Sequence, residues 1–370
     1  NGELSCGQDG NDGACNDRHR SGNDPDAENT RNSGKLAPEP FGIDADENGL
    51  TVMVTNQTSG AVSLFSTPRK DRDAEGNPAS HIAWDEGPRY VFQESGLPAR
   101  PIGIASLPMP LALPSSGRDR LPGYLVSFRN QASIFLLRVY DDAVADPARP
   151  YTRRYESVPI TTNSSGVDSR GIGIDSFKRK AQEQACVERY GIQNGCERNP
   201  TAAGCEAALD SAFQACLTDA AAVSLEVFIA NRAPSSLILG RSTTINSDSV
   251  TNDLPGLFTS LPLDVGPSRV YVGAIMNAEG KRERRIFTTC FDSRRISIYD
   301  PEQQRVETEV VTGRGPQAMA FDIGEDHAFA YVGHFLDSYI GVVDLDQRHR
   351  GQYGAMIATM GDPVPPRASK

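Results

Sequence analysis

A repeated pattern of short apolar segments limits what this chain can fold into more than any other feature. Residues 42–65 align without a gap with residues 320–343, and residues 289–299 fit the same frame. Each copy has a short apolar segment, a polar turn, a second apolar segment and, after a Ser/Gly turn, a third segment of alternating polarity. Short strands repeated at intervals of tens of residues predict a propeller or a solenoid.

Five such units can be counted along the chain, and each has a fourth, more polar segment. The units cover about residues 38–97, 98–167, 168–265, 266–314 and 315–362. The fourth segments are residues 89–93, 154–158, 257–261, 305–310 and 355–359. Four antiparallel strands, apolar inside and polar outside, are typical of a propeller blade, whereas a solenoid has shorter and more regular coils. We therefore expect an all-β fold, a β-propeller of five or more four-stranded antiparallel blades.

The best-preserved motif of the repeat lies in its second segment. The first unit reads Val52-Met-Val-Thr-Asn56 there, and the last unit keeps part of this motif as Tyr331-Val-Gly-His334. These motifs resemble the YVTN-type β-propeller repeat, over about residues 38–362 and most clearly in the first, fourth and fifth units. The resemblance implies an extracytoplasmic propeller and says little about the ligand or the reaction.

Charge and hydropathy exclude several classes of function. The chain has 48 acidic and 37 basic side chains, a formal net charge of −11, and no run of five basic residues. This composition argues against a protein that binds nucleic acid through the phosphate backbone. No stretch approaches the roughly 18 consecutive apolar residues that a membrane span needs, so we expect no membrane-spanning segment. The 34 glycines and 25 prolines favour many turns over long helices.

The two ends of the chain differ from the repeats. Residues 1–37 carry few large apolar side chains and many Asp, Asn, Gly and Arg, so we expect an extended or disordered acidic tail. A Cys6–Cys15 disulfide would pin this tail, and residues 363–370 would form a short C-terminal tail. The acidic run at residues 9–12 lacks the later Glu of a calcium loop. No cofactor is expected, with structural calcium as the one ion left open.

The seven cysteines indicate the compartment. Two lie near the start, four lie within residues 186–216, and Cys290 stands apart. Even-numbered clusters in polar segments are typical of disulfides and therefore of an oxidising location. No CxxC motif occurs, and the spacings are too wide for a zinc site. We expect a periplasmic, outer-membrane-associated or extracellular protein, and a lipid anchor upstream of Asn1 would fit that location.

Residues 176–222 interrupt the third unit with two helix-forming runs joined by Gly, Asn and Pro. The spacings Cys186-x9-Cys196 and Cys205-x10-Cys216 resemble a twin CX9C helical hairpin. In an antiparallel hairpin, the nested pairs Cys186–Cys216 and Cys196–Cys205 are the natural choice among the three connectivities. The insertion either docks a partner or is a stapled surface element without one.

Arginines near the start of the first strands suggest a ligand-binding site at the mouth of the propeller channel. The candidates are Arg100, Arg170, Arg269, Arg314 and Gln317. Converging guanidinium groups suit a carboxylate or a phosphate, through bidentate hydrogen bonds. On a chain of net charge −11, such a patch would be a local exception. The alternative is that each arginine pairs with an acid of its own blade, for instance Asp168 or Asp264.

A second ring of positions lies directly after the second strand of each unit. The aligned repeats place Asn56, Asn130, Asn231, Cys290 and His334 there. An Asn at this position is expected to cap the following turn. The thiol and the imidazole on neighbouring units could hold a metal or move a proton, but two ligands make a poor site and a buried free cysteine is common. We therefore expect no metal at Cys290 and His334, which are only weak candidates.

Signatures of common enzymes are missing, because the chain has no GxSxG, HExxH, P-loop or CxxCH motif. We expect a non-enzymatic binding or scaffolding subunit of a bacterial envelope or extracellular assembly. It would recognise a protein partner through the propeller face and the helical insertion. The alternative is a propeller hydrolase or lactonase-like enzyme with its site at the channel mouth. A bound metal or a cluster of perturbed carboxylates there would favour the enzyme.

Overall fold

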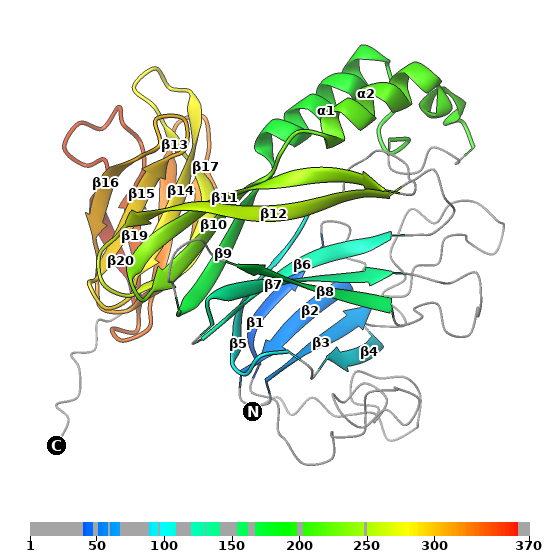
Figure 1. The fold of residues 1–370 in the computed structure, drawn as a ribbon. Helices are drawn as coiled ribbons and strands as arrows, with labels where there is room; N and C mark the ends of the chain where they lie inside the picture. Colours follow the sequence, from blue (N-terminus) through cyan, green and yellow to red (C-terminus); the bar gives the residue numbers. More distant parts are fainter. Residues whose placement is uncertain are drawn as a thin grey trace, which may run out of the picture.

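Five four-stranded antiparallel sheets follow one another as blades, which confirms the expected β-propeller architecture (Figure 1). The computed structural model describes residues 40–46, 51–57, 60–66, 89–94, 97–108, 120–129, 131–140, 154–161, 167–197, 203–247 and 250–361. In every blade the strands are hydrogen-bonded in chain order, from the innermost to the outermost. The polar fourth segment of each repeat forms the outermost strand.

The strand bounds follow the repeat in every blade. Blade 1 holds β1 (Pro40–Ala45), β2 (Thr51–Asn56), β3 (Ala61–Ser66) and β4 (Arg89–Glu94). Blade 2 holds β5 (Pro101–Ser106), β6 (Arg120–Phe128), β7 (Ser133–Tyr140) and β8 (Arg154–Thr161). Blade 3 holds β9 (Ser169–Asp175), β10 (Glu226–Arg232), β11 (Ser235–Ser247) and β12 (Val250–Pro262). Blade 4 holds β13 (Pro267–Met276), β14 (Arg282–Cys290), β15 (Arg295–Asp300) and β16 (Arg305–Val311). Blade 5 holds β17 (Pro316–Ile323), β18 (Ala328–His334), β19 (Tyr339–Asp344) and β20 (Met356–Met360).

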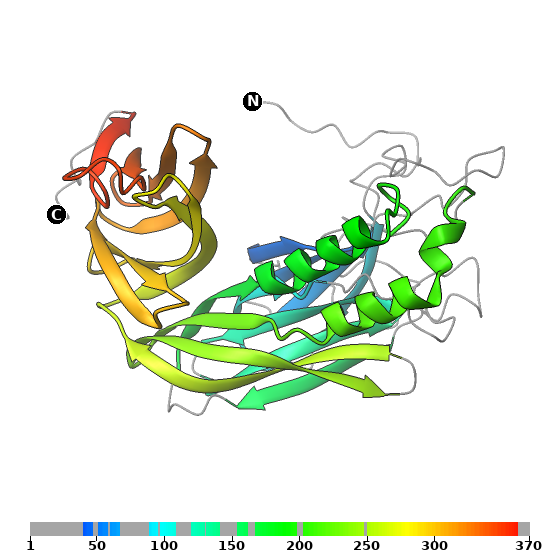
Figure 2. The same cartoon turned by 90° about the horizontal axis from the view of Figure 1, so that it is seen from above.

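Apolar cores fill the junctions between consecutive blades. Met53 and Leu64 of blade 1 pack with Phe128 of blade 2. Similar cores join blades 2 and 3, blades 3 and 4, and blades 4 and 5. Among the described residues no such core joins blade 5 to blade 1, and the blades form an open arc (Figure 2). In blade 5, Ile340 and Met360, which are paired across β19 and β20, remain 42% and 45% exposed.

Glycines let the inner strands of neighbouring blades approach at backbone distance. Three inner strands carry one at equivalent positions: Gly42 in β1, Gly103 in β5 and Gly171 in β9. A Cβ at Gly103 would overlap the carbonyl oxygen of Arg170, and one at Gly171 would lie 2.5 Å from Arg269 Cα. The Ser127 hydroxyl also donates to the Arg170 carbonyl at 2.6 Å. This close approach sets β5, β9 and β13 side by side and brings their first residues together.

The helical insertion follows β9 as a hairpin beside the extended strands of blade 3 (Figures 1 and 2). Its elements are α1 (Phe177–Arg189), the 3-10 turn η4 (Glu206–Leu209) and α2 (Ser211–Ala221). Its disulfides are Cys186–Cys216 and Cys196–Cys205, which confirms the predicted nested pairing. Cys6 and Cys15 lie outside the described residues. Neither described helix has the length and apolar content needed to cross a membrane.

One ion pair ties the insertion to blade 3. Arg179 of α1 is 1% exposed, and its Nη1 and Nη2 each donate to a carboxylate oxygen of Asp253 on β12 at 2.7 Å. Its Nε and Nη2 also donate to the Val223 carbonyl, at 2.9 and 2.7 Å. Every nitrogen of this guanidinium therefore has a partner. Because removing a charge from water is costly, such complete pairing is what allows an arginine to be buried there.

Candidate anion-binding site

Five arginines gather at the end of the arc where the inner strands of blades 2, 3 and 4 begin. This arginine cluster consists of Arg100 before β5, Arg129 after β6, Arg170 in β9, Arg232 in β10 and Arg269 in β13. The Arg129 N–H donates to the Arg100 carbonyl at 3.1 Å, and the Arg232 N–H donates to the Asp168 carbonyl at 2.9 Å. Arg129 also forms an isolated antiparallel bridge with Asp168, which links blade 2 to blade 3. Backbone pairing therefore holds these residues close together.

Two of the five arginines have acidic partners. Arg170 holds Asp168 through two hydrogen bonds, Nε to Oδ1 at 2.6 Å and Nη2 to Oδ2 at 2.9 Å. Arg232 donates to the Ser268 hydroxyl at 2.9 Å and lies 3.5 Å from a carboxylate oxygen of Asp292. Its Nε atom is nevertheless buried without a hydrogen-bond partner.

The side chains of the other three arginines have no hydrogen bond or ion pair within the described part of the chain. The Nε atom of Arg129 is buried without a partner. Burial lowers the pKa of Arg129, and the positive charge of Arg170 lowers it further, while Asp168 opposes this. Burial also lowers the pKa of Arg269, against an opposing effect of Tyr271. The cluster therefore holds more positive charge than its own acids neutralise.

An oxyanion is the ligand that such an arrangement can accept. A buried polar group without a partner costs free energy, and neighbouring cations repel one another. A carboxylate or phosphate placed among the guanidinium groups would accept their free N–H groups and offset the repulsion. Arginine suits this role because its planar fork donates two parallel hydrogen bonds.

The backbone at Arg100 is held in an unfavourable conformation. Its φ angle is 65°, in the left-handed region that glycine adopts most easily. The equivalent residues of blades 4 and 5 are Gly266 and Gly315, with φ angles of 83° and 67°. All three carbonyls accept the N–H of the residue that follows the second strand of their blade. An exposed arginine of the cluster thus occupies a position that is glycine in blades 4 and 5, and strain of this kind is common at functional sites.

Of the other two residues predicted at the mouth, Arg314 is paired within its own blade and Gln317 is held through its backbone carbonyl. Arg314 pairs with Asp337 of its own blade, with Nε donating to Oδ1 at 2.6 Å. The Gln317 carbonyl accepts a hydrogen bond from the Tyr271 hydroxyl at 2.9 Å, which fixes the start of β17. The alternative of pairing within one blade therefore holds for Arg314, as it does for Arg170.

Arg100, Arg170 and Arg269 lie near the start of inner strands, as expected, but they occupy three different positions of the repeat. Arg100 precedes the inner strand β5, whereas Arg170 is the second residue of β9 and Arg269 is the third residue of β13. Asp264, the second acid considered as a partner, instead lies 3.0 Å from Arg295. The site therefore depends on the packing of neighbouring blades and does not correspond to a single position of the repeat.

Arg129 and Arg232 were not among the predicted site residues, although both occupy the same position in their blades. Each is the first residue after the second-strand ring position, in blades 2 and 3. Phe291 and Phe335 occupy the same position in blades 4 and 5, as their equivalent backbone hydrogen bonds show. The residue after the predicted ring position Asn231 is Arg232, so the repeat alone could have found it, whereas Arg129 lies one residue before the predicted position Asn130 and emerges only from the strand pairing in the structure.

The second ring of positions also differs from its prediction in blade 2. The proline that starts the inner strand pairs with Asn56 in blade 1 and with Phe128 in blade 2. The same pairing selects Cys290 and His334 in blades 4 and 5. Phe128 therefore takes the place predicted for Asn130, which lies outside the described residues.

Cys290 and His334 are both buried, in environments that keep them uncharged. Burial raises the pKa of the Cys290 thiol to about 12. The His334 Nε2 accepts the Gly313 N–H at 3.0 Å and its Nδ1 faces the Tyr339 carbonyl at 3.3 Å, which is the pattern of a neutral imidazole. Burial also lowers the pKa of His334. Among the residues that the structure describes, no group of three or more His, Cys, Asp or Glu side chains could hold a metal ion.

A cavity of 530 Å³ runs along the inner strands beside the cluster. Ile43, Ile104 and Ile172 contribute apolar side chains to its walls. Arg269 lines it near the start of the inner strands, and Lys180 of α1 lines it where those strands end. A ligand held at Arg269 could therefore extend along this cavity, whose lining is both polar and apolar.

Comparisons with known proteins identify no family for this chain and give only distant structural likenesses. No family model matches the chain, and no curated protein matches it. AztD from Citrobacter koseri is 14% identical, with 87% of this chain and 74% of that chain covered and a TM-score of 0.38. A 6-phosphogluconolactonase-like protein from Bacteroides uniformis is 10% identical, with 90% and 74% covered and a TM-score of 0.45. These likenesses concern the fold alone.

Proposed function

We propose that this protein is a non-enzymatic binding protein that holds an anionic group of its partner at the arginine cluster. One observation carries this proposal. Within the part of the chain that the structure describes, the guanidinium groups of Arg100, Arg129 and Arg269 form no hydrogen bond and no ion pair. Cationic groups left without partners favour an anion between them. The chain as a whole has a net charge of −11, so the cluster is a local exception.

The state of the two carboxylates in the cluster favours binding over hydrolysis. Asp168 accepts hydrogen bonds from Arg170 with both of its oxygens, and Asp292 lies against Arg232. A general base needs a carboxylate that is available to a substrate or to a water molecule. Asp168, with both oxygens held by Arg170, is therefore a poor candidate for the general base of a lactonase-like enzyme.

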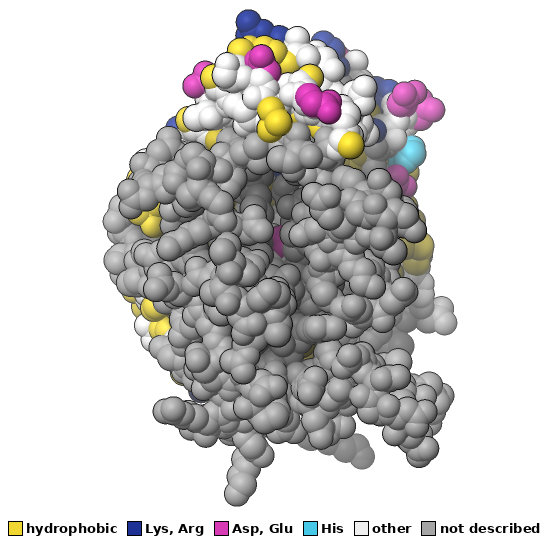
Figure 3. All heavy atoms as spheres, turned by 90° about the vertical axis from the view of Figure 1, so that its right-hand side faces the viewer, with side chains coloured by type: hydrophobic (Ala, Val, Ile, Leu, Met, Phe, Trp, Pro, Cys, Tyr) yellow, Lys and Arg dark blue, Asp and Glu magenta, His cyan; other side chains and the backbone are white. Residues whose placement is uncertain are grey.

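We also propose that the protein is a YVTN-type propeller of a bacterial envelope or extracellular assembly. The support is the pair of disulfides in the insertion, since disulfides persist in oxidising compartments. The helical hairpin would offer a second contact surface to a protein partner. Acidic, basic and hydrophobic side chains all appear on its outer surface (Figure 3), as on many protein-binding surfaces.

Titration with simple anions tests the binding function. Citrate and inorganic phosphate are titrated into the protein at low salt, and the heat of binding is measured. Replacing Arg129 by Gln should weaken binding by about tenfold or more, because one charge-assisted hydrogen-bond donor is removed from the site. Binding by the unaltered protein should also weaken as salt is added, since salt screens exposed charges.

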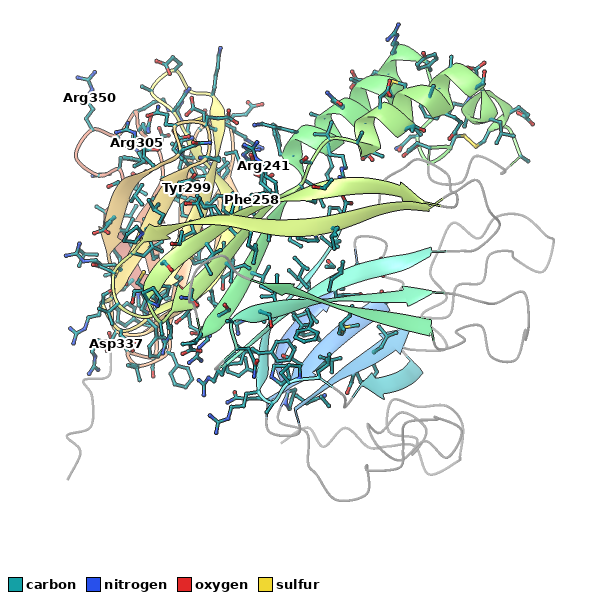
Figure 4. The ribbon with its side chains drawn as sticks, in the orientation of Figure 1. Arg241, Phe258, Tyr299, Arg305, Asp337 and Arg350 are labelled. Atoms are coloured by element: carbon teal, nitrogen blue, oxygen red, sulfur yellow. A yellow bond between two sulfur atoms is a disulfide. The ribbon has the colours of Figure 1, made fainter. Side chains whose placement is uncertain are left out.

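Arg305→Gln is the matched control. Arg305 is an exposed arginine at the end of the blades opposite Asp337 (Figure 4), so this variant should bind anions like the unaltered protein. Absence of saturable anion binding by the unaltered protein would contradict the proposal. An equal loss in Arg305→Gln and Arg129→Gln would also contradict it, because the binding would then reflect overall charge.

A further inference from the structure

Exposed aromatic side chains border the arginine cluster. Phe41 is 39% exposed and Phe335 is 75% exposed. The Arg269 guanidinium lies 5.2 Å from the centre of the Phe41 ring, and the Arg232 guanidinium lies 5.9 Å from the centre of the Phe291 ring. The Phe291 and Phe335 ring centroids are 6.4 Å apart. Cations and rings therefore adjoin each other along this end of the arc.

The repeat itself creates this arrangement. The residue after the ring position of the second strand is Arg129 in blade 2, Arg232 in blade 3, Phe291 in blade 4 and Phe335 in blade 5. In each case its N–H donates to the carbonyl of the residue before the inner strand, at 2.8 to 3.1 Å. Because the backbone position is the same, these four side chains leave their blades at the same end. We call this row of four residues the mouth rim.

The composition of the mouth rim is that of a protein-binding surface. Arginine and aromatic side chains supply much of the binding energy at interfaces between proteins. An exposed ring such as that of Phe335 gains roughly 25 cal/mol for each Å² of apolar surface that a partner covers. Leu336, the next residue, is also 49% exposed. The arginine half of the rim adds charge complementarity to an acidic ligand.

We propose that the mouth rim binds an acidic protein segment in which a carboxylate side chain stands beside an aromatic or large aliphatic one. This inference rests on the proposed anion-binding function and names its ligand class. The carboxylate would lie among the arginines of the cluster, and the apolar side chain would cover Phe291 and Phe335.

The charges around the rim favour this ligand over a single-stranded nucleic acid. Nucleic acids also stack on aromatic rings and pair with arginine. Asp292 and Asp337 are already paired with Arg232 and Arg314, but the chain as a whole has a net charge of −11 and the arginines of the rim belong to blades 2 and 3 only. A continuous row of phosphates would be repelled there, whereas a short segment can place one carboxylate at the arginines.

Three labelled peptides of equal length test the proposal by fluorescence anisotropy at low salt. The first alternates Glu with Phe, the second has Ala in place of each Phe, and the third has Gln in place of each Glu. The first peptide should bind about tenfold tighter than either of the others. Phe335→Ala should reduce its affinity to that of the second peptide while leaving citrate binding unchanged. Phe258→Ala is the control, since Phe258 is 59% exposed but lies on the outer strand β12 (Figure 4).

The other outcomes separate this inference from the function on which it rests. Equal binding of the first two peptides, with citrate binding intact, would overturn the inference and leave the anion site standing. Loss of peptide binding in Phe258→Ala equal to that in Phe335→Ala would also overturn it. Tighter binding of a thymidine oligonucleotide than of the first peptide would assign the rim to nucleic acid. Failure to bind citrate as well as every peptide would contradict the anion-binding function itself.

Discussion

Arg179, which anchors the helical insertion, and Arg129, at the mouth, are both arginines that the fold takes partly or wholly out of water. Arg179 is 1% exposed, and all its nitrogens donate hydrogen bonds to Asp253 or to the Val223 carbonyl. Arg129 has a buried Nε without a partner and lies near the positive charge of Arg170. The Arg179 guanidinium is fully paired within the protein, whereas the Arg129 guanidinium lacks a hydrogen-bond acceptor that a ligand can supply.

The largest effect is expected when the ion pair of Arg179 and Asp253 is broken. Arg179→Met leaves the Asp253 carboxylate buried without its cation, so stability should fall by about 3 to 5 kcal/mol. Urea unfolding followed by circular dichroism measures the loss. The double variant Arg179→Met, Asp253→Leu should recover much of it, because no unpaired charge remains. Loss below about 1 kcal/mol in the single variant would show that the ion pair does not anchor the insertion.

Replacing Arg129 of the arginine cluster should raise stability, whereas replacing Arg179 lowers it. Arg129→Met removes an unpaired buried donor and one of several neighbouring cations, so the ligand-free protein should be about 1 kcal/mol more stable. The same urea experiment measures this change, with phosphate and citrate left out of the buffer. A loss of stability comparable to that of Arg179→Met would give Arg129 a structural role and remove the contrast between the two regions.

A smaller change in stability is expected when the unfavourable backbone conformation at Arg100 is relieved. Arg100→Gly relieves the left-handed backbone conformation but makes the unfolded chain more flexible, so the net gain in stability should be about 0.5 kcal/mol. Thermal unfolding of this variant measures the gain, and Gly315→Ala, which places a side chain at an equivalent position, should be destabilised. A clear loss of stability in Arg100→Gly would show that the Arg100 side chain holds the mouth together.

Much of the fold could be predicted because the repeat encodes it locally. The alternation of apolar residues sets each strand, and the polar fourth segments become the outer strands because they face solvent on one side. The pairing Cys186–Cys216 and Cys196–Cys205 could be predicted because only nested pairs suit an antiparallel hairpin. These features depend on short stretches of chain, which a single sequence displays directly.

The candidate site was predicted only in part, because it depends on contacts between blades. Arg170 and Arg269 meet because the inner strands approach at Gly171, where the backbone of one blade touches the next. Arg129 lies close to them because of its backbone bridge to Asp168, which the repeat pattern does not predict. A repeat alignment compares equivalent positions, whereas this site combines positions that are not equivalent.

The sequence by itself determined the blades, their strands and the disulfide-linked insertion, since each follows from the order of apolar, polar and turn residues nearby. Only the tertiary structure decided which arginines remain without partners. A guanidinium is neutralised by whichever acid lies within a few ångströms, and that distance is set by how neighbouring blades pack. Arg314 thus finds Asp337 on its own blade, while Arg129 is placed among cations of the next blade.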